Sequence, residues 1–160
     1  MDQDFIRIEK VVKAILCDFP EIKLIYLFGS RAQKKVGSRS DYDFAVLTDP
    51  KQSGGDLRAR IAHAFSIKLN YDGIDVVLLN NSPIDLAYAV ISNGKRFYEK
   101  SVEIRIDYEA YVLGRYFDYL PILRAQRDEV IRGENHASRI QRYRETFGRT
   151  ERTLSQIGTS

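Results

Sequence analysis

The sequence predicts an α/β fold in which short apolar strands alternate with amphipathic helices. Apolar residues recur at helical spacing in residues 4–19 and 56–70, whereas residues 22–28, 41–47 and 73–79 contain short, nearly continuous apolar runs. The first pattern is typical of helices that pack by one face, and the second of strands covered by other elements. With 160 residues, of which 44% are hydrophobic, the chain has room for one globular domain with a sizeable core.

The first helix is expected over residues 4–19, with Asp2 or Asp4 as its cap and Pro20 ending it. The single cysteine, Cys17, falls in the apolar pattern of this helix and is expected to be a buried thiol. Only two histidines occur in the whole sequence. A zinc cluster or a serine–histidine–aspartate triad is therefore not expected.

The middle of the chain is expected to build a sheet. A flexible loop at residues 48–55 follows the strand of residues 41–47, and the helix of residues 56–70 crosses over to the strand of residues 73–79. The charged residues of this helix, Arg58 among them, fall mostly off its apolar face. They are expected at the surface.

The last third of the chain is expected to be mainly helical. Ser82 and Pro83 begin a short helix, residues 95–98 are expected to form an edge strand, and a long helix follows from Ser101 to about Arg132. A proline at position 121 is expected to kink or break that helix. The tyrosines and arginines of the long helix favour a partner surface, with core or oligomer packing as the alternative.

The chemistry is expected in residues 29–43, which read GSRAQKKVGSRSDYD. In an extended chain Asp41 and Asp43 project to the same side. Two neighbouring carboxylates repel each other, and both stay ionised only if a cation lies between them. Mg²⁺ prefers such hard oxygen ligands together with substrate phosphates. Gly29 and Ser30 end the preceding strand in a turn where backbone amides can approach a phosphate.

A third carboxylate is expected from Asp75, which lies between apolar neighbours where an unpaired charge would be costly. If its strand pairs beside that of Asp43, three carboxylates converge, as in-line nucleotidyl transfer with two metal ions requires. Asp72 is a rival, but it precedes the strand and is favoured as a turn residue. Among the cations between residues 30 and 40, Arg39 is the preferred phosphate contact, with a solvated basic loop as the alternative.

The order Gly-Ser, ten residues, Asp-x-Asp and a later acidic strand resembles the minimal nucleotidyltransferases of the DNA polymerase β superfamily. The chain length and the helical extension are similar to those of the MntA-type antitoxins. This resemblance implies a polymerase β-like fold, with a small mixed sheet packed with helices and a C-terminal helical extension. It suggests a nucleotidyltransferase domain at residues 1–100, a helical extension packed on it at 101–133, and a basic tail or helix at 134–160.

The resemblance also implies an activity, which is the transfer of AMP from ATP to a tyrosine hydroxyl of a partner HEPN-family ribonuclease toxin. The implied metal ligands and catalytic residues are Asp41, Asp43 and Asp75, with two Mg²⁺ ions, and the implied nucleotide-binding residues are Gly29, Ser30 and Arg39. Two alternatives stay open. One is an antitoxin that only masks its partner, and the other is an enzyme whose acceptor is an RNA or a small-molecule hydroxyl.

The net charge of +3 comes wholly from residues 132–160, which hold six arginines and three glutamates. This basic segment would favour RNA, but the sequence contains no recognisable RNA-binding motif, and nucleic acid is not the expected partner. The first residues lack the basic and apolar regions of a signal peptide, and no apolar run approaches membrane-spanning length. A cytoplasmic protein is expected.

Overall fold

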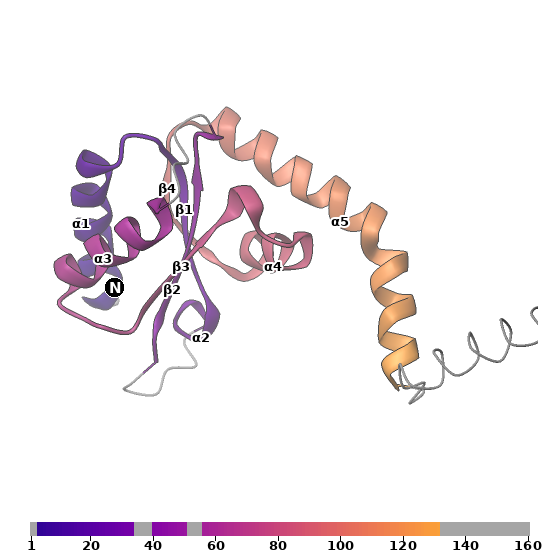
Figure 1. Ribbon diagram of the computed structural model, residues 1–160. Coiled ribbons are helices and arrows are strands. Elements are labelled where there is room, and N and C mark those ends of the chain that lie inside the picture. Colours follow the sequence, from indigo (N-terminus) through magenta and orange to yellow (C-terminus); the bar gives the residue numbers. More distant parts are fainter. Residues whose placement is uncertain (1–2, 34–39, 51–55, 132–160) are drawn as a thin grey trace, which may run out of the picture. The chain divides into compact units, whose positions relative to one another are not determined.

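A four-stranded mixed sheet with helices on both faces forms the body of the fold (Figure 1). The computed structural model describes residues 3–33, 40–50 and 56–131. The elements, in chain order, are α1 (Gln3–Asp18), β1 (Ile22–Phe28), α2 (Gly29–Ala32), β2 (Tyr42–Thr48), α3 (Leu57–Leu69), β3 (Ile74–Leu78), the 3₁₀ helix η2 (Leu79–Asn81), α4 (Ile84–Asn93), β4 (Lys95–Glu99) and α5 (Val102–Ile131).

The strand order is β3-β2-β1-β4. β1 is antiparallel to both β2 and β4, whereas β2 and β3 are parallel. A parallel pair needs a crossover connection, which α3 supplies. The predicted α/β class with a small mixed sheet is therefore confirmed, and β4 lies at an edge, as predicted. The other edge strand is β3.

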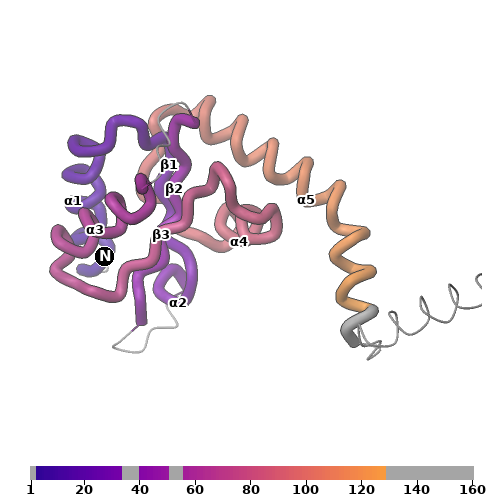
Figure 2. Tube along the Cα trace, in the orientation of Figure 1, coloured from indigo at the N-terminus to yellow at the C-terminus, as the bar shows by residue number. Residues whose placement is uncertain are grey.

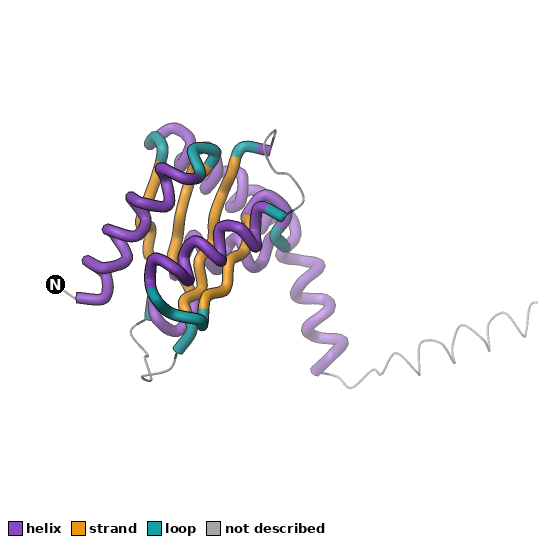
Figure 3. Tube along the Cα trace, turned by 60° about the vertical axis from the view of Figure 1, so that its left-hand side comes forward, coloured by secondary structure: helices purple, strands orange, loops and turns teal. Residues whose placement is uncertain are grey.

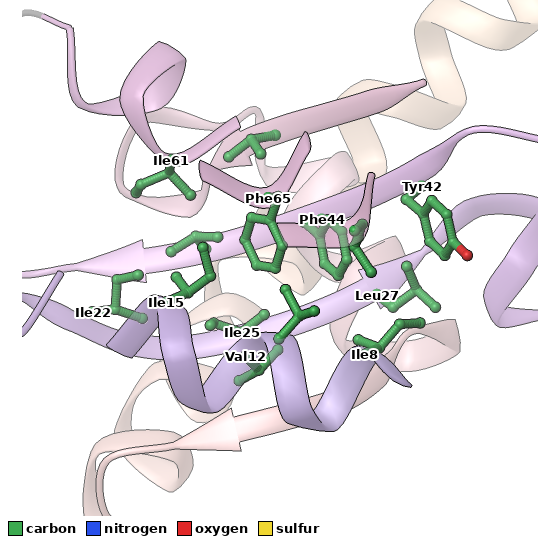
Figure 4. Packing of buried hydrophobic residues seen from close by; sticks show 14 of the residues in the cluster. Ile8, Val12, Ile15, Ile22, Ile25, Leu27, Tyr42, Phe44, Ile61 and Phe65 are labelled. Carbon is green, nitrogen blue, oxygen red and sulfur yellow. The ribbon is translucent and has the colours of Figure 1, made fainter. Parts of the chain in front are cut away.

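The first face of the sheet packs against α1 and α3, which lie side by side across it (Figure 3). Tyr42, Phe44 and Val46 of β2 all point into this layer, as the alternation in the sequence predicts. Phe44 stacks on Phe65 of α3, with ring centroids 4.1 Å apart and an interplanar angle of 12° (Figure 4). Aromatic stacking of this kind adds to the burial that joins α3 to the sheet.

The second face packs against α4 and the beginning of α5, where Val112 is fully buried with Leu24 and Val90. Ile104 and Tyr108 of α5 pack against the same cluster. These residues belong to the aromatic face of the long helix, for which the sequence favours a partner. That part of the face instead covers the sheet.

The chain falls into two compact units, of which the first contains the sheet and ends at Tyr116, and the second begins at Phe117. α5 runs through Pro121 without interruption, so the break that a proline can cause is not found there. Pro121 is exposed, and water can replace the backbone donor that proline lacks.

Cys17 is also exposed, which makes the expectation of a buried thiol wrong. No helix among the described residues has the length and apolar character needed to span a bilayer.

Candidate active site

The carboxylates of the sequence motif lie on two neighbouring strands at one end of the sheet. In the strand register, Asp43 of β2 stands opposite Asp75 of β3 on one side and Phe28 of β1 on the other. The prediction that the Asp75 strand pairs beside the Asp-x-Asp strand is therefore confirmed. Gly29 follows Phe28 directly and begins α2, which lies beside the start of β2 (Figure 2). Asp41 immediately precedes β2.

Two glycines allow the carboxylates to pack tightly against the backbone. Gly29 has a φ of +71°, and a Cβ at this position would overlap Asp43 Oδ2 and lie 3.0 Å from Asp43 Cγ. A Cβ on Gly73 would overlap Asp41 Oδ1 and lie 2.8 Å from Tyr71 Cε1. The positive φ favours glycine at Gly29, where a side chain would also displace the Asp43 carboxylate. A side chain at Gly73 would displace the side chains of Asp41 and Tyr71. The Gly29 turn, which the sequence predicts to bind phosphate, therefore lies directly beside the Asp43 carboxylate.

The charges at this end of the sheet repel one another. Burial raises the pKa of the Asp43 carboxyl, and the negative charges of Asp75 and then Asp41 raise this pKa further. Each effect disfavours the ionised form of Asp43. A divalent cation would reverse this, since it would stabilise all three carboxylates in their ionised state.

The chemistry of these donors fits Mg²⁺, which takes hard oxygen ligands and is usually held by a few carboxylates and substrate phosphates. Within residues 3–33, 40–50 and 56–131, no group of three or more acidic, histidine or cysteine side chains is spaced to share one ion. Asp75 forms an ion pair with Arg58. The fit to a metal ion thus rests on the ligand type and on the mutual repulsion of the carboxylates.

Arg58, in the first turn of α3, reaches the third carboxylate. Its Nε donates to the carbonyl oxygen of Val76 at 2.8 Å, and its Nη2 lies 3.1 Å from Asp75 Oδ1. The side chains of Arg58 and Asp75 are 67% and 56% exposed. From the sequence, a charge at Asp75 between apolar neighbours is expected to be costly unless it is paired or metal-bound. The charge is paired with Arg58, but its cost is smaller than expected because β3 is an edge strand and the side chain is about half exposed.

Arg31 holds the other side of the site and is largely enclosed, with a side chain only 10% exposed. Its guanidinium carbon lies 3.7 Å from the ring centroid of Tyr42 and 5.3 Å from that of Tyr71. Its Nη1 pairs with Asp4 at 3.2 Å, and its Nε donates to the carbonyl oxygen of Ser40 at 2.6 Å. The Tyr71 hydroxyl donates to the same oxygen at 3.2 Å. Arg31 therefore fixes the backbone just before the Asp41 carboxylate.

Sequence reasoning missed the roles of both arginines. In the sequence, Arg31 is one of several basic residues that include Arg39, whose position lies outside the described residues. Arg58 is expected only as a general surface residue. A signal is present for Arg58, because a cation in the first turn of a helix opposes the helix dipole and so suggests a specific acceptor. No comparable signal marks Arg31, since its partners are brought together only by the fold.

The fold and the carboxylate motif together define a nucleotidyltransferase. The family model described as polymerase beta, nucleotidyltransferase, matches residues 10–103, more than half of the chain. The chain belongs to this family, which confirms the resemblance seen in the sequence.

Among individual relatives, the chain is 36% identical over 94 residues to the protein adenylyltransferase MntA of Aphanizomenon flos-aquae, covering 54% of this chain. The chain spans 63% of the length of that relative. It also resembles a chain in a crystal structure of a toxin–antitoxin pair with AMP-PNP, with a TM-score of 0.68, 27% identity, and coverage of 77% of this chain and 98% of the other. A structure of a tri-AMPylated Shewanella oneidensis HEPN toxin with an MNT antitoxin gives a TM-score of 0.63 and 25% identity, with coverage of 77% and 95%.

Proposed function

We propose that this chain is an antitoxin that transfers AMP from ATP to a tyrosine hydroxyl of a partner HEPN-family toxin and thereby neutralises it. The observation that carries the proposal is the register that places Asp43 between Asp75 and the residue before Gly29. The relatives of the chain include an adenylyltransferase and a chain that accompanies an AMPylated HEPN toxin. Such a reaction consumes ATP, which favours the cytoplasm.

Each residue of the motif has a task in this reaction. Gly29 and Ser30 position the triphosphate at the turn after β1, with Arg39 as a further phosphate contact. Asp41 and Asp43 hold Mg²⁺, and Asp75 completes the metal site and helps to take the proton from the acceptor hydroxyl. When bound, the metal ions neutralise phosphate charge and lower the pKa of the attacking hydroxyl. The protein itself contributes mainly positioning, because Arg31 fixes the backbone that leads into Asp41.

The proposal divides the chain by task. Residues 1–100 form the nucleotidyltransferase domain, residues 101–133 the helical extension, and residues 134–160 a basic tail or helix. The match of the family model to residues 10–103 supports the extent of the first of these parts.

A surface on α5 supports the formation of a stable complex with the partner. Val102, Ile106 and Leu113 are 47%, 52% and 40% exposed, and their spacing of four and seven residues places them on one side of the helix. An exposed apolar helix face of this kind is suited to pack on a helical partner. The same surface would serve an antitoxin that only masks its toxin, so the chemistry must be tested separately from binding.

The test is intact-mass spectrometry of the co-purified partner after incubation with ATP and Mg²⁺. The wild-type protein is expected to add mass in steps of about one AMP. The double variant Asp41→Asn/Asp43→Asn is expected to slow this addition by at least about 100-fold, because it removes the charge that holds the metal. Asp85→Asn serves as a matched control, since Asp85 is an exposed carboxylate on α4 outside the motif.

Three results would contradict the proposal. If the wild-type protein adds no mass to the partner yet still inhibits it, the chain acts by masking. If the double variant adds AMP as fast as wild type, the carboxylates do not carry the reaction. Labelling of an RNA in place of the partner would move the acceptor to the other open alternative.

A further inference from the structure

A surface pocket of about 530 Å³ lies beside Asp75, at the outer edge of the sheet. Its volume falls within the range of about 300–1,000 Å³ that is typical of sites for small ligands. The pocket is lined by Asp56, Arg58, Ala59, Ala62, Ile74 and Asp75. It therefore combines the first turns of α3 with the beginning of β3, and it does not include the Gly29 turn.

The position of this pocket matters because nucleotidyl transfer is an in-line displacement. The attacking oxygen and the leaving pyrophosphate lie on opposite sides of the reacting phosphorus. Along the sheet, the Gly29 turn follows β1, Asp43 lies in β2 and Asp75 in β3. If the triphosphate is bound at Gly29, its leaving group points toward the β1 side. The acceptor must then enter from the β3 side, where the pocket lies.

The lining of the pocket suits an aromatic hydroxyl. Ala59, Ala62 and Ile74 provide short apolar side chains against which a ring can lie, and two of them, Ala62 and Ile74, also pack against the core. The Arg58 guanidinium is planar and readily stacks on aromatic rings. Arg58 is held in the pocket by its hydrogen bonds to Val76 and Asp75. Asp75 offers a carboxylate to a hydroxyl at the rim.

From this arrangement we infer that the pocket between α3 and β3 binds the acceptor tyrosine of the partner, an inference that rests on the proposed function. The ring lies on Ala59 and Ala62 beside Arg58, with its hydroxyl toward Asp75. In the reaction the tyrosine oxygen forms a bond to the α-phosphorus of ATP. The bond from that phosphorus to the oxygen that bridges to the β-phosphorus breaks, and pyrophosphate leaves with the electron pair. Asp75 accepts the hydroxyl proton and passes it on to solvent.

The test fills the pocket without touching the carboxylates. Ala59 is exposed on α3, so Ala59→Trp places an indole in the pocket with little disturbance of the core. Ile67→Trp is the matched control, because Ile67 is 65% exposed on the same helix and does not line the pocket. For each variant, kcat/KM for AMP transfer to the co-purified partner and the equilibrium affinity for AMP-PNP with Mg²⁺ are measured.

The pocket inference predicts that Ala59→Trp lowers kcat/KM for the partner by at least about tenfold, mainly through KM, with the AMP-PNP affinity unchanged. Ile67→Trp is expected to match wild type in both measurements. The inference is overturned if Ala59→Trp transfers AMP as efficiently as wild type, or if it loses nucleotide affinity to the same extent as transfer. A wild-type protein that transfers no AMP at all would instead refute the proposed function, so the two failures are distinguishable.

A cross-linking experiment tests the same contact directly. The photoreactive residue p-benzoylphenylalanine is placed at position 59 or, as a control, at position 67, and the complex with the partner is irradiated. Position 59 is expected to cross-link to the partner peptide that carries the AMPylated tyrosine, whereas position 67 is not. Cross-linking of position 59 only to other peptides would overturn the inference even if Ala59→Trp failed to fold.

Discussion

Arg31 and Arg58 flank the carboxylates, and they form the same two kinds of hydrogen bond in very different surroundings. Arg31 donates from Nε to the carbonyl oxygen of Ser40 and from Nη1 to Asp4. Arg58 likewise donates from Nε to a backbone carbonyl and from Nη2 to an aspartate. The Arg31 side chain is 10% exposed and lies between two tyrosine rings, whereas that of Arg58 is 67% exposed.

This difference separates two tasks within one site. A largely enclosed guanidinium that bonds to both a carboxylate and a backbone carbonyl cannot leave these partners without a cost in free energy, so the Arg31 side is suited to fix geometry. An exposed pair exchanges readily with water and contributes little to stability. The Arg58 side can therefore change partners when a substrate arrives. The site is therefore expected to be rigid on the side of the Gly29 turn and adaptable on the side of the proposed acceptor pocket.

The largest effect is expected at Arg31. Arg31→Ala is predicted to lower the free energy of unfolding by about 2–4 kcal/mol, because it removes a charged donor from both Asp4 and the Ser40 carbonyl in a partly buried setting. Urea unfolding followed by circular dichroism measures this loss. Arg31→Lys keeps the charge but not the planar fork, and is expected to recover less than half of it. A loss below about 0.5 kcal/mol would show that this side is no more rigid than the other.

The next effect concerns Tyr42, whose hydroxyl donates to Asp4 at 2.5 Å. Burial, followed by this hydrogen bond, raises the pKa of Tyr42 to about 12. The neutral phenol is therefore favoured in the folded state, and its contribution is complete below about pH 10, where the unfolded tyrosine is also neutral. Between about pH 10 and 12 only the unfolded tyrosine ionises, so stability falls as the pH rises.

Tyr42→Phe removes this titration. The variant is expected to lose about 1–2 kcal/mol near neutral pH, where the hydrogen bond is missing. Between about pH 10 and 12 its stability should fall less steeply than that of wild type, by up to about 1.4 kcal/mol for each pH unit. Tyr26 and Tyr108, whose pKa values are also raised, titrate in both proteins and cancel in the comparison. Parallel pH curves for the two proteins would contradict this account.

At Asp43, which lies between the Arg31 and Arg58 sides of the site, a substitution is expected to change the free energy of unfolding by a smaller amount and to increase it. Neither arginine bonds to Asp43 within the described residues. Because the pKa of Asp43 is raised in the folded state, the stability that this residue contributes is lost as the pH rises through that pKa. Asp43→Asn removes the charge and should stabilise the metal-free protein by up to about 1 kcal/mol, or about 4 °C in a chain of this size.

Calorimetry with and without Mg²⁺ gives the control for this prediction. Mg²⁺ is expected to raise the unfolding temperature of wild type and to have a much smaller effect on Asp43→Asn, since a bound ion stabilises only the form that binds it. A variant that is less stable than metal-free wild type would show that the Asp43 charge is well compensated in the folded protein even without a metal ion.

The smallest effect is expected at Arg58. Arg58→Ala should change the free energy of unfolding by less than about 1 kcal/mol, because the pair with Asp75 is exposed and water can solvate the Val76 carbonyl. Comparison of this value with that of Arg31→Ala is the most direct measure of the contrast between the two flanks. Equal losses for Arg31→Ala and Arg58→Ala would remove that contrast.

Much of the fold could be predicted because apolar runs and glycine turns act locally. Residues 22–28 form β1 as predicted, and the predicted strand at 41–47 occurs one residue later, as β2. The sequence could predict that Asp75 lies beside Asp43 only on the assumption that their strands pair. Strand pairing joins residues that are far apart in sequence, so local patterns do not determine it. Once β3 pairs in parallel with β2, Asp75 takes its place beside Asp43.

The errors have physical causes of the same kind. Cys17 lies two residues after the fully buried Ile15, about 200° around the helix, so helical geometry alone places it away from the core. The aromatic residues of α5 serve two faces, since Tyr108 packs on the sheet and Tyr111 is 60% exposed. The amino-acid composition of the helix could not show which of these tyrosines packs on the sheet and which is exposed. The roles of the two arginines depend on the three-dimensional arrangement of five separate segments, which are α1, α2, residues 40–42, α3 and residues 71–76.

The edge position of β3 has a consequence for how the protein avoids self-association. An edge strand presents unpaired backbone groups that can recruit a strand from another molecule, and charged side chains along the edge discourage such pairing. Arg58 donates a hydrogen bond to the Val76 carbonyl oxygen and places a cation at this edge, next to the carboxylate of Asp75. A second sheet docking on β3 would have to displace that hydrogen bond and bury both charges. The charges along β3 thereby discourage pairing with a second copy of the chain, and they leave this edge available to the proposed acceptor.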